Sequence, residues 1–97
     1  MEVIFLEPAR KDIRIAYEWY EDRKSGLGIK FTKEVISYSQ KLKNVNIEYR
    51  IYFSNVRYLK LQTFPFSIFF FREADKAFII GVLHNRQDSM TILRPGT

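Results

Sequence analysis

The amino-acid sequence predicts an α+β domain, in which an N-terminal strand and an α-helical hairpin pack on an antiparallel β-sheet. Two observations predict this class. Apolar residues recur at helical spacing in the first half of the chain, and residues 57–88 hold three apolar runs separated by short polar segments. Because 97 residues, 46% of them hydrophobic, suffice for one core and are too few for two, we expect residues 1–97 to form a single domain.

The N-terminal half predicts a strand followed by two helices. Residues 2–6 form a short apolar run typical of a strand, and Pro8 suits the first turn of a helix because its missing N–H has no partner there. Helical spacing continues to about Lys24, and Gly26 can take the left-handed conformation that follows a helix. A second amphipathic helix begins near Gly28, and so short a turn favours an antiparallel hairpin. The apolar positions of the two helices are Ala9, Ile13, Ala16, Tyr17 and Tyr20, then Phe31, Val35, Tyr38 and Leu42.

The second half predicts the sheet. Residues 44–56 mix polar residues with scattered aromatics, which favours a linker with some extended structure. Alternation at 58–62 indicates a half-buried strand, and the dense apolar runs at 66–71 and 77–83 are typical of strands that pair as an antiparallel meander. Because both faces of the last two runs are apolar, we expect the helical hairpin to cover at least one of them. Residues 90–93 would add a short final strand before a loose tail.

The composition excludes several classes of site. The chain has no cysteine and a single histidine, so disulfides, thiolate metal sites and a zinc site made by the protein alone are not expected. The apolar runs are shorter than the ~20 residues that span a bilayer, and the N-terminus lacks the basic and apolar segments of a signal peptide. We expect a cytoplasmic protein that needs no cofactor and does not enter a membrane.

Positive charge is concentrated in the second half of the chain. The net charge is +5; residues 1–48 hold nine Lys or Arg against eight Asp or Glu, whereas residues 49–97 hold seven against three. This excess suits a phosphate-rich or acidic partner, and a solubilising surface explains it equally well. The cations concerned are Arg50, Arg57, Lys60, Arg72, Lys76, Arg86 and Arg94.

The most suggestive polar cluster begins at His84, directly after the third apolar run. A histidine beside arginines can act as acid or base in RNA cleavage, with Arg57, Arg72 or Arg86 stabilising the charged phosphate. The simpler alternative is that His84 hydrogen-bonds a neighbour and Arg86 pairs with Asp88. The sequence is compatible with both interpretations.

Other motifs have ordinary structural explanations. Gly26 and Gly28 are too close for a phosphate-binding loop and do not follow a strand, so they indicate a turn. The carboxylates do not cluster as an acid/base pair would. Tyr17, Trp19 and Tyr20 can stack on bases, but aromatic residues at helical spacing more often pack in a core or hairpin.

Three segments together resemble the RelE/ParE superfamily, the toxin half of bacterial type II toxin/antitoxin modules, which include plasmid stabilization systems. The resemblance covers most of the chain. It implies the same strand, helical hairpin and antiparallel sheet, and an antitoxin protein that wraps the toxin. The segments are 9–35 (Ala9, Asp12, Ile13, Trp19, Tyr20, Glu21, Gly26, Gly28, Phe31, Glu34 and Val35), 57–68 (Arg57, Phe64, Pro65, Phe66, Ser67 and Ile68) and 82–88 (Val82, Leu83, His84, Arg86 and Asp88).

The superfamily divides between two activities. ParE-like members poison DNA gyrase by binding, whereas RelE-like members cut messenger RNA, usually on the ribosome. The nuclease branch commonly places an arginine after the aromatic residue of the middle strand, and here Ser67 follows Phe66. The resemblance therefore favours a ParE-like, gyrase-directed toxin with no reaction of its own. Its implied target-binding or antitoxin-binding residues are Arg57, Lys60, Arg72, Arg86 and Arg94.

Two alternatives remain. One is a ribosome-dependent nuclease, whose site residues would be His84, Arg86, Arg57 and Arg72. The other is a weakened, non-toxic binding module, because the chain departs from the common ParE pattern at Gln62, Thr63, Gln87 and Ser89.

Overall fold

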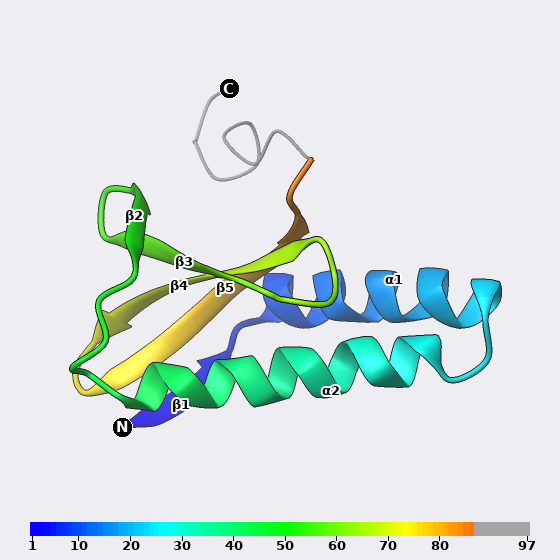
Figure 1. Ribbon diagram of the computed structural model, residues 1–97. Coiled ribbons are helices and arrows are strands. Elements are labelled where there is room, and N and C mark those ends of the chain that lie inside the picture. The colour runs from blue at the N-terminus through cyan, green and yellow to red at the C-terminus, as the bar shows by residue number, and fades with distance from the viewer. Residues whose placement is uncertain (87–97) are drawn as a thin grey trace.

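Five strands and two α-helices make up residues 1–86, the part of the chain that the computed structural model describes (Figure 1). The α+β class and the helical hairpin predicted from the sequence are confirmed. The expected strand at 90–93 and the tail after it lie outside the described residues. The elements are β1 (Glu2–Phe5), α1 (Glu7–Arg23), α2 (Leu27–Gln40), a 3-10 turn (Lys41–Lys43), β2 (Arg50–Phe53), β3 (Val56–Lys60), β4 (Phe66–Glu73) and β5 (Lys76–His84).

The five strands form one mixed sheet in the order β1-β5-β4-β3-β2. Strands β3 to β5 make the antiparallel meander that the apolar runs predict, and β2 adds a fourth antiparallel strand to it. The sheet as a whole is not purely antiparallel, because β1 pairs with β5 in parallel, from Glu2 opposite Lys76 to Phe5 opposite Ile79. A parallel pair needs a long crossover connection, and here the helical hairpin and the meander supply it.

One strand lies where the sequence favoured a linker. Residues 44–56 contain β2, whose Ile51, Tyr52 and Phe53 are all good strand formers. The chain turns at Ser54, which has a positive φ of 55°, and β3 begins at Val56. The aromatic residues of this segment were therefore a strand signal, and Ser54 with its neighbour marks a hairpin turn.

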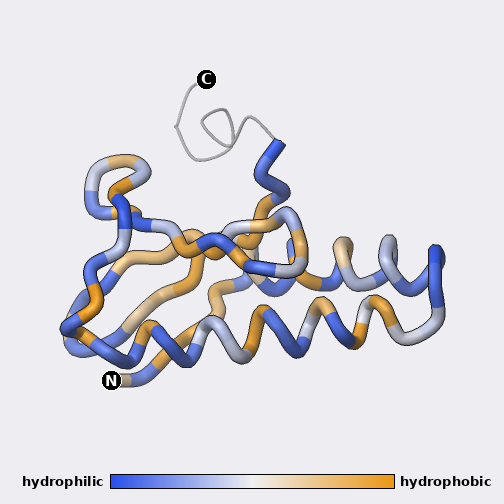
Figure 2. The backbone as a smooth tube through the Cα atoms, viewed as in Figure 1, coloured by the Kyte–Doolittle hydropathy of each residue, from blue (hydrophilic) through white to orange (hydrophobic). Residues whose placement is uncertain are grey.

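The helices cover one face of the sheet (Figure 1). This agrees with the expectation that the helical hairpin covers at least one of the two apolar faces. Hydrophobic and hydrophilic positions alternate around both helices in Figure 2, which is the pattern of helices with one buried side. The core between helices and sheet consists of Ala9, Ala16, Phe31, Val35, Leu42, Leu61, Phe64, Ile68, Phe70, Ala77, Ile79 and Val82.

A one-residue bulge in β5 changes which residues face the helices. Phe69 pairs with Gly81 and Phe70 pairs with Ile79, so Ile80 is an extra residue on β5. Ile79 faces the core before the bulge and Val82 faces it afterwards, three positions later instead of two or four. The bulge thus places His84, which pairs with Phe66, on the helix-covered side of the sheet.

The two helices approach closely at Gly28. A Cβ atom at this position would lie 2.5 Å from the backbone oxygen of Tyr17, so only glycine allows the observed spacing. Gly26 has a φ of +91°, the left-handed conformation that its position in the turn predicts. The Glu21 carboxylate accepts hydrogen bonds from the N–H groups of Gly26 (3.1 Å) and Gly28 (2.8 Å) and thereby satisfies donors at the start of α2.

Aromatic side chains cover part of the opposite face of the sheet. Phe69 is only 5% exposed, because the rings of Tyr52 and Tyr58 lie 5.0 Å and 6.0 Å from it, centre to centre. Farther along the same face, the rings of Phe71 and Phe78 stack at 5.1 Å. Within the described residues, the apolar face of the sheet that points away from the helices is thus covered in part by aromatic side chains of the strands themselves.

Candidate functional site

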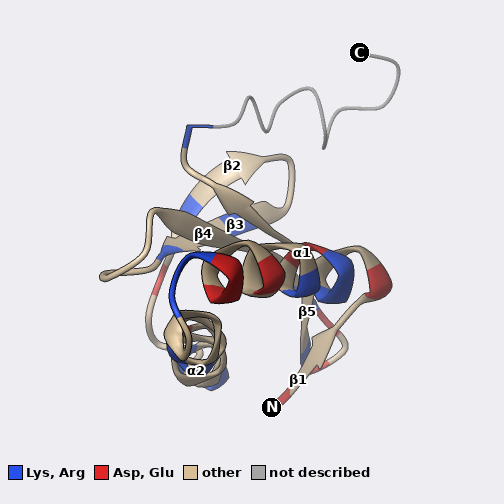
Figure 3. Ribbon diagram, turned by 90° about the vertical axis from the view of Figure 1, so that its right-hand side faces the viewer, with Lys and Arg blue, Asp and Glu red and all other residues tan. Residues whose placement is uncertain are grey.

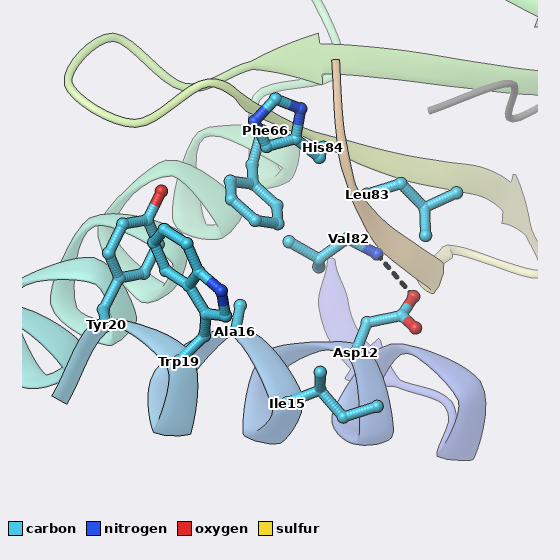
Figure 4. A pocket seen from close by; sticks show the side chains of 9 residues that line it. All are labelled: Asp12, Ile15, Ala16, Trp19, Tyr20, Phe66, Val82, Leu83 and His84. Carbon is cyan, nitrogen blue, oxygen red and sulfur yellow. Dashed lines mark hydrogen bonds between the residues drawn. The ribbon is translucent and has the colours of Figure 1, made fainter. Parts of the chain in front are cut away.

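A groove of about 480 Å³ opens between α1 and the end of β5 (Figure 4). Its position follows from the unequal lengths of two neighbouring strands. The chain leaves the sheet after β1 and enters α1 at Glu7, whereas β5 continues to His84. The last backbone hydrogen bond beside β1 runs from the Leu6 N–H to the Ile79 carbonyl. The groove is lined by Asp12, Ile15, Ala16, Trp19, Tyr20, Phe66, Val82, Leu83 and His84.

Asp12 lies at the floor of this groove and binds the edge of β5. Its Oδ2 atom accepts a hydrogen bond of 3.0 Å from the backbone N–H of Val82, drawn as a dashed line in Figure 4. Burial raises the pKa of the Asp12 carboxyl group, although the hydrogen bond from Val82 and the charge of Lys11 act in the opposite direction. The carboxylate therefore occupies a backbone donor that a neighbouring strand would otherwise use.

The apolar wall of the groove is half open to solvent. Ile15 is 55% exposed and Trp19 is 50% exposed, although both are large apolar residues. Trp19 also contacts the guanidinium of Arg23, which lies 3.4 Å from the ring centroid. Deeper in the groove the rings of Phe66 and His84 meet at 5.2 Å. Exposed apolar side chains around a cavity are typical of a surface that binds a partner.

His84 is held at the end of β5 by its neighbours. Its Nδ1 atom accepts a hydrogen bond of 3.0 Å from the backbone N–H of Arg86, so the neutral ring carries its proton on Nε2. The next residue, Asn85, accepts a 2.6 Å hydrogen bond from the Ser67 hydroxyl. The hydrogen bond between His84 and a neighbour, which the simpler interpretation predicts, is thus present. The same interpretation also predicts an ion pair between Arg86 and Asp88, and Asp88 lies outside the described residues.

Two of the arginines proposed for phosphate binding contact backbone carbonyls in another part of the sheet. Arg57 donates to the Tyr49 carbonyl, and Arg72 donates to the Leu42 carbonyl at 3.0 Å. The Arg72 guanidinium also lies 5.8 Å from the centre of the Tyr49 ring. Both arginines are partly buried and fix the chain between α2 and β2.

The structure does not bring these arginines to His84. His84 pairs with Phe66, and Arg72 is six residues farther along β4, about 20 Å away at ~3.3 Å per residue. Arg57 pairs with Phe70, four residues from Phe66, or about 13 Å by the same measure. The candidate nuclease residues therefore do not form one cluster, apart from His84 and Arg86.

Of the remaining cations of the prediction, Lys60 and Arg86 are exposed. Lys60 lies on β3 beside a shallow pocket of about 350 Å³, which is also lined by Arg50, Tyr58 and Leu59. Arg86 is exposed just after β5. Figure 3 shows Lys and Arg on β2 and β3, whereas α1 itself carries charged residues of both signs. Arg94 lies outside the described residues.

Sequence reasoning gave Asp12 and Ile15 of α1 no role in a site, and it considered Trp19 only for stacking on bases or for packing. Asp12, Ile15 and Trp19 recur at intervals of three and four, which is the spacing of a second stripe on the helix beside the predicted core stripe. Tyr20 packs against Phe31 and Phe64, as hairpin packing predicts, but Trp19 does not share this burial. The signal was a large apolar residue outside the core stripe.

Within residues 1–86, no group of three or more His, Cys, Asp or Glu side chains is placed to hold a metal ion. None of the helices in this range is long and apolar enough to cross a membrane.

Comparisons with known proteins find similarity in three dimensions and not in sequence. No protein-family model and no curated protein sequence matches the chain. A chain in a solved structure described as "Chromosomal ParDE TA system from P. aeruginosa" matches with a TM-score of 0.79, over 87% of this chain and 95% of the solved chain, at 20% sequence identity. The predicted architecture is thereby confirmed: the chain shares its fold with a chain of that ParDE system.

Proposed function

We propose that the chain is the toxin of a type II toxin/antitoxin module, that it acts by binding DNA gyrase, and that an antitoxin neutralises it. The observation that carries this proposal is the similarity of nearly the whole fold to a chain of a ParDE system. The proposal places the protein in the cytoplasm, where such a target acts on DNA.

The arrangement of the cations supports binding in preference to catalysis. General acid/base chemistry needs its groups within hydrogen-bond reach of one substrate atom. Arg57 and Arg72 instead donate to backbone carbonyls about 13 and 20 Å along the sheet from the strand pair that holds His84. We therefore assign Arg57 and Arg72 to the scaffold, and assign target or antitoxin contacts to the exposed Lys60 and Arg86. Arg94 stays a predicted contact.

A supercoiling assay with purified chain, DNA gyrase, ATP and relaxed plasmid tests the proposed target. We expect loss of supercoiled product and accumulation of cleaved DNA. The double variant Lys60→Ala/Arg86→Ala should weaken inhibition about tenfold while the fold survives, since contacts at an interface are individually modest. Lys33→Ala on α2 is the matched control, because it removes another exposed cation.

A folded chain that arrests growth without affecting gyrase would contradict the proposed target. Cleavage of ribosome-bound messenger RNA that is lost by orders of magnitude in His84→Ala would then establish the nuclease alternative. A folded chain that leaves growth unchanged when expressed alone would instead identify a non-toxic binding module.

A further inference from the structure

The β2–β3 hairpin carries positive charge that no acidic residue of the hairpin balances (Figure 3). Its residues 50–60 include Arg50, Arg57 and Lys60 and no aspartate or glutamate. Arg57 is used within the fold, because it donates to the Tyr49 carbonyl. Within residues 1–86, the side chains of Arg50 and Lys60 form no ion pair and no hydrogen bond, and both residues are exposed. Both cations are therefore accessible to a ligand.

Strand pairing brings these two cations together. Arg50 lies directly opposite Tyr58, and Lys60 is two residues farther along β3. Residues in this diagonal relation lie on the same face of a sheet, ~7–8 Å apart. Because the side chains of arginine and lysine are long, their charged groups can reach one small anion between them. The shallow pocket of about 350 Å³ that Arg50, Tyr58, Leu59 and Lys60 line is at this place.

Tyr58 adds a further donor to the lining of the pocket. Its ring is held on the sheet by the rings of Phe69 and Tyr52, whose centres lie 6.0 Å and 6.5 Å away. Within the described residues, the Tyr58 hydroxyl group makes no hydrogen bond. A phosphate group accepts hydrogen bonds from guanidinium, ammonium and hydroxyl donors alike. The pocket thus offers three donor side chains suited to an oxyanion.

The pocket is separate from His84. β3 and β2 are the last two strands of the sheet, at the edge away from β1. Because Tyr58 pairs with Phe69, its side chain lies on the face away from the helices, whereas His84 lies on the helix-covered side. Among the described residues, no histidine or carboxylate lines the pocket. The pocket therefore has groups that hold a phosphate and lacks the usual acid/base pair that cleaves a phosphodiester.

We propose that Arg50, Tyr58 and Lys60 bind a backbone phosphate of the DNA on which gyrase acts, so that the chain contacts this DNA as well as the enzyme. This inference rests on the proposed function for the identity of the nucleic acid. Seven Lys or Arg against three Asp or Glu in residues 49–97 attract DNA toward this half of the chain.

The chemistry of the pocket favours DNA over an acidic protein. DNA carries one negative charge per ~1.7 Å of its axis, so a phosphate can reach a shallow pocket without the shape match that a protein side chain needs. A contact to the backbone carries no base information, so binding should be independent of DNA sequence. It should also weaken steeply with salt, because the counterions that DNA releases must be replaced.

Fluorescence anisotropy with the purified chain and a short labelled DNA duplex tests the contact. Arg50→Gln/Lys60→Gln should weaken binding about tenfold, because two charge-assisted hydrogen bonds to one phosphate are lost. The slope of log Kd against log salt concentration should fall by about 1, the value for one phosphate contact. Tyr58→Phe keeps the ring and removes the hydroxyl group, and should weaken binding about threefold.

The matched control is Lys30→Gln/Lys33→Gln, which removes the same charge from exposed positions of α2. It should change the affinity for DNA less than twofold. Equal losses from the two double variants would mean that net charge alone attracts DNA, and would overturn the site. Circular dichroism checks that each variant is folded, which is expected because all four cations are exposed.

Competitors distinguish the possible sources of the anion. Displacement of DNA by inorganic phosphate, beyond that by potassium chloride of equal ionic strength, would identify a site for the free ion and overturn the DNA contact. Displacement by polyglutamate as effective as that by unlabelled duplex, at equal charge, would identify a site for an acidic protein and overturn it as well. We expect only unlabelled duplex to compete well.

Failure of this inference and failure of the proposed function are distinguishable, because the binding assay contains no gyrase. In the supercoiling assay, Arg50→Gln/Lys60→Gln should inhibit gyrase less than the unaltered chain does. If this variant lost its affinity for DNA and still inhibited gyrase fully, the DNA contact would be overturned and the proposed function would stand. If the unaltered chain bound DNA through Arg50 and Lys60 without affecting gyrase, the proposed function would fail and the phosphate site would stand.

Discussion

Two apolar stripes of one helix, α1, have different surroundings. Ala9 and Ala16 of the first stripe are buried under the sheet and against α2. Ile15 and Trp19 of the second stripe are half exposed beside β5. Helical spacing alone does not distinguish the buried stripe from the exposed one. It shows which residues share a face of α1, but it does not show which element packs against that face. The comparison shows that burial along α1 depends on where β1 ends.

The largest loss of stability is expected from removing Phe31 of α2, an aromatic side chain that packs against α1. Phe31 is fully buried and its ring lies 5.4 Å from Tyr20 of α1 and 5.3 Å from Phe64. Phe31→Ala should lower the free energy of unfolding by about 3–5 kcal/mol, because it leaves a cavity as well as losing burial. Urea denaturation followed by circular dichroism measures this. A loss below about 1 kcal/mol would mean that the aromatic cluster does not hold the hairpin to the sheet.

A smaller loss is expected at the point where the helices touch. Gly28→Ala would place a Cβ atom 2.5 Å from the Tyr17 backbone oxygen, so α2 must move away from α1. We expect a loss of about 1–3 kcal/mol in the free energy of unfolding. The control is Gly26→Asn, at an open position with a φ of +91°, because asparagine tolerates the left-handed conformation and should cost less. Equal losses from both variants would contradict the close packing at Gly28.

The pH dependence of stability should distinguish the groove carboxylate from a carboxylate that holds the hairpin to the sheet. Burial raises the pKa of Glu34, but hydrogen bonds from Thr63 and Phe64 together outweigh it and the pKa is lowered overall. Glu34 therefore contributes stability above its unfolded pKa, near 4.5, which is lost as the pH falls through the folded value. The pKa of Asp12 is raised, so its contribution has the opposite sign: stability falls as the pH rises from about 3.8 through the folded value.

Two variants check these signs by urea midpoints at pH 3 and pH 7. Relative to the unaltered chain, Glu34→Gln should become less stable toward pH 7, and Asp12→Asn should become more stable. We expect both differences to be smaller than the effect of Gly28→Ala, because both groups are partly solvated. If Asp12→Asn and the unaltered chain differ in urea midpoint by the same amount at pH 3 and pH 7, the Asp12 carboxylate is not desolvated in the groove.

The smallest effect is expected in the exposed stripe. Ile15→Glu should change the free energy of unfolding by no more than about 0.5 kcal/mol, as is usual for exposed positions. Ile36→Glu, on α2 and 51% exposed, is the matched control and should behave alike. A loss above about 1.5 kcal/mol from Ile15→Glu alone would mean that the second stripe belongs to the core after all.

The sequence predicts those elements whose pattern is local. Pro8, Gly26 and the helical spacing of α1 and α2 are enough to place the hairpin, and the runs at 66–71 and 77–83 identify β4 and β5. β2 was harder to predict, because Ile51 and Phe53 are exposed and their segment carries no alternating pattern of burial.

The groove depends on distant parts of the chain and could not be read in the same way. It needs β1 to pair in parallel with β5 and to stop at Phe5, a relation between residues more than seventy positions apart. The hydrogen bond from Val82 to Asp12 spans seventy positions. His84 reaches the groove only because the bulge at Ile80 shifts the side chains that follow it.

That bulge has a consequence for aligning this sequence with others. From Ile80 onward, the inward-facing positions of β5 are displaced by one residue relative to a regular strand. A gap-free alignment with a relative that lacks the extra residue would match Val82 and His84 to outward-facing positions and Leu83 to an inward-facing one. Any transfer of residue roles across the end of β5 should therefore place a single-residue gap at Ile80.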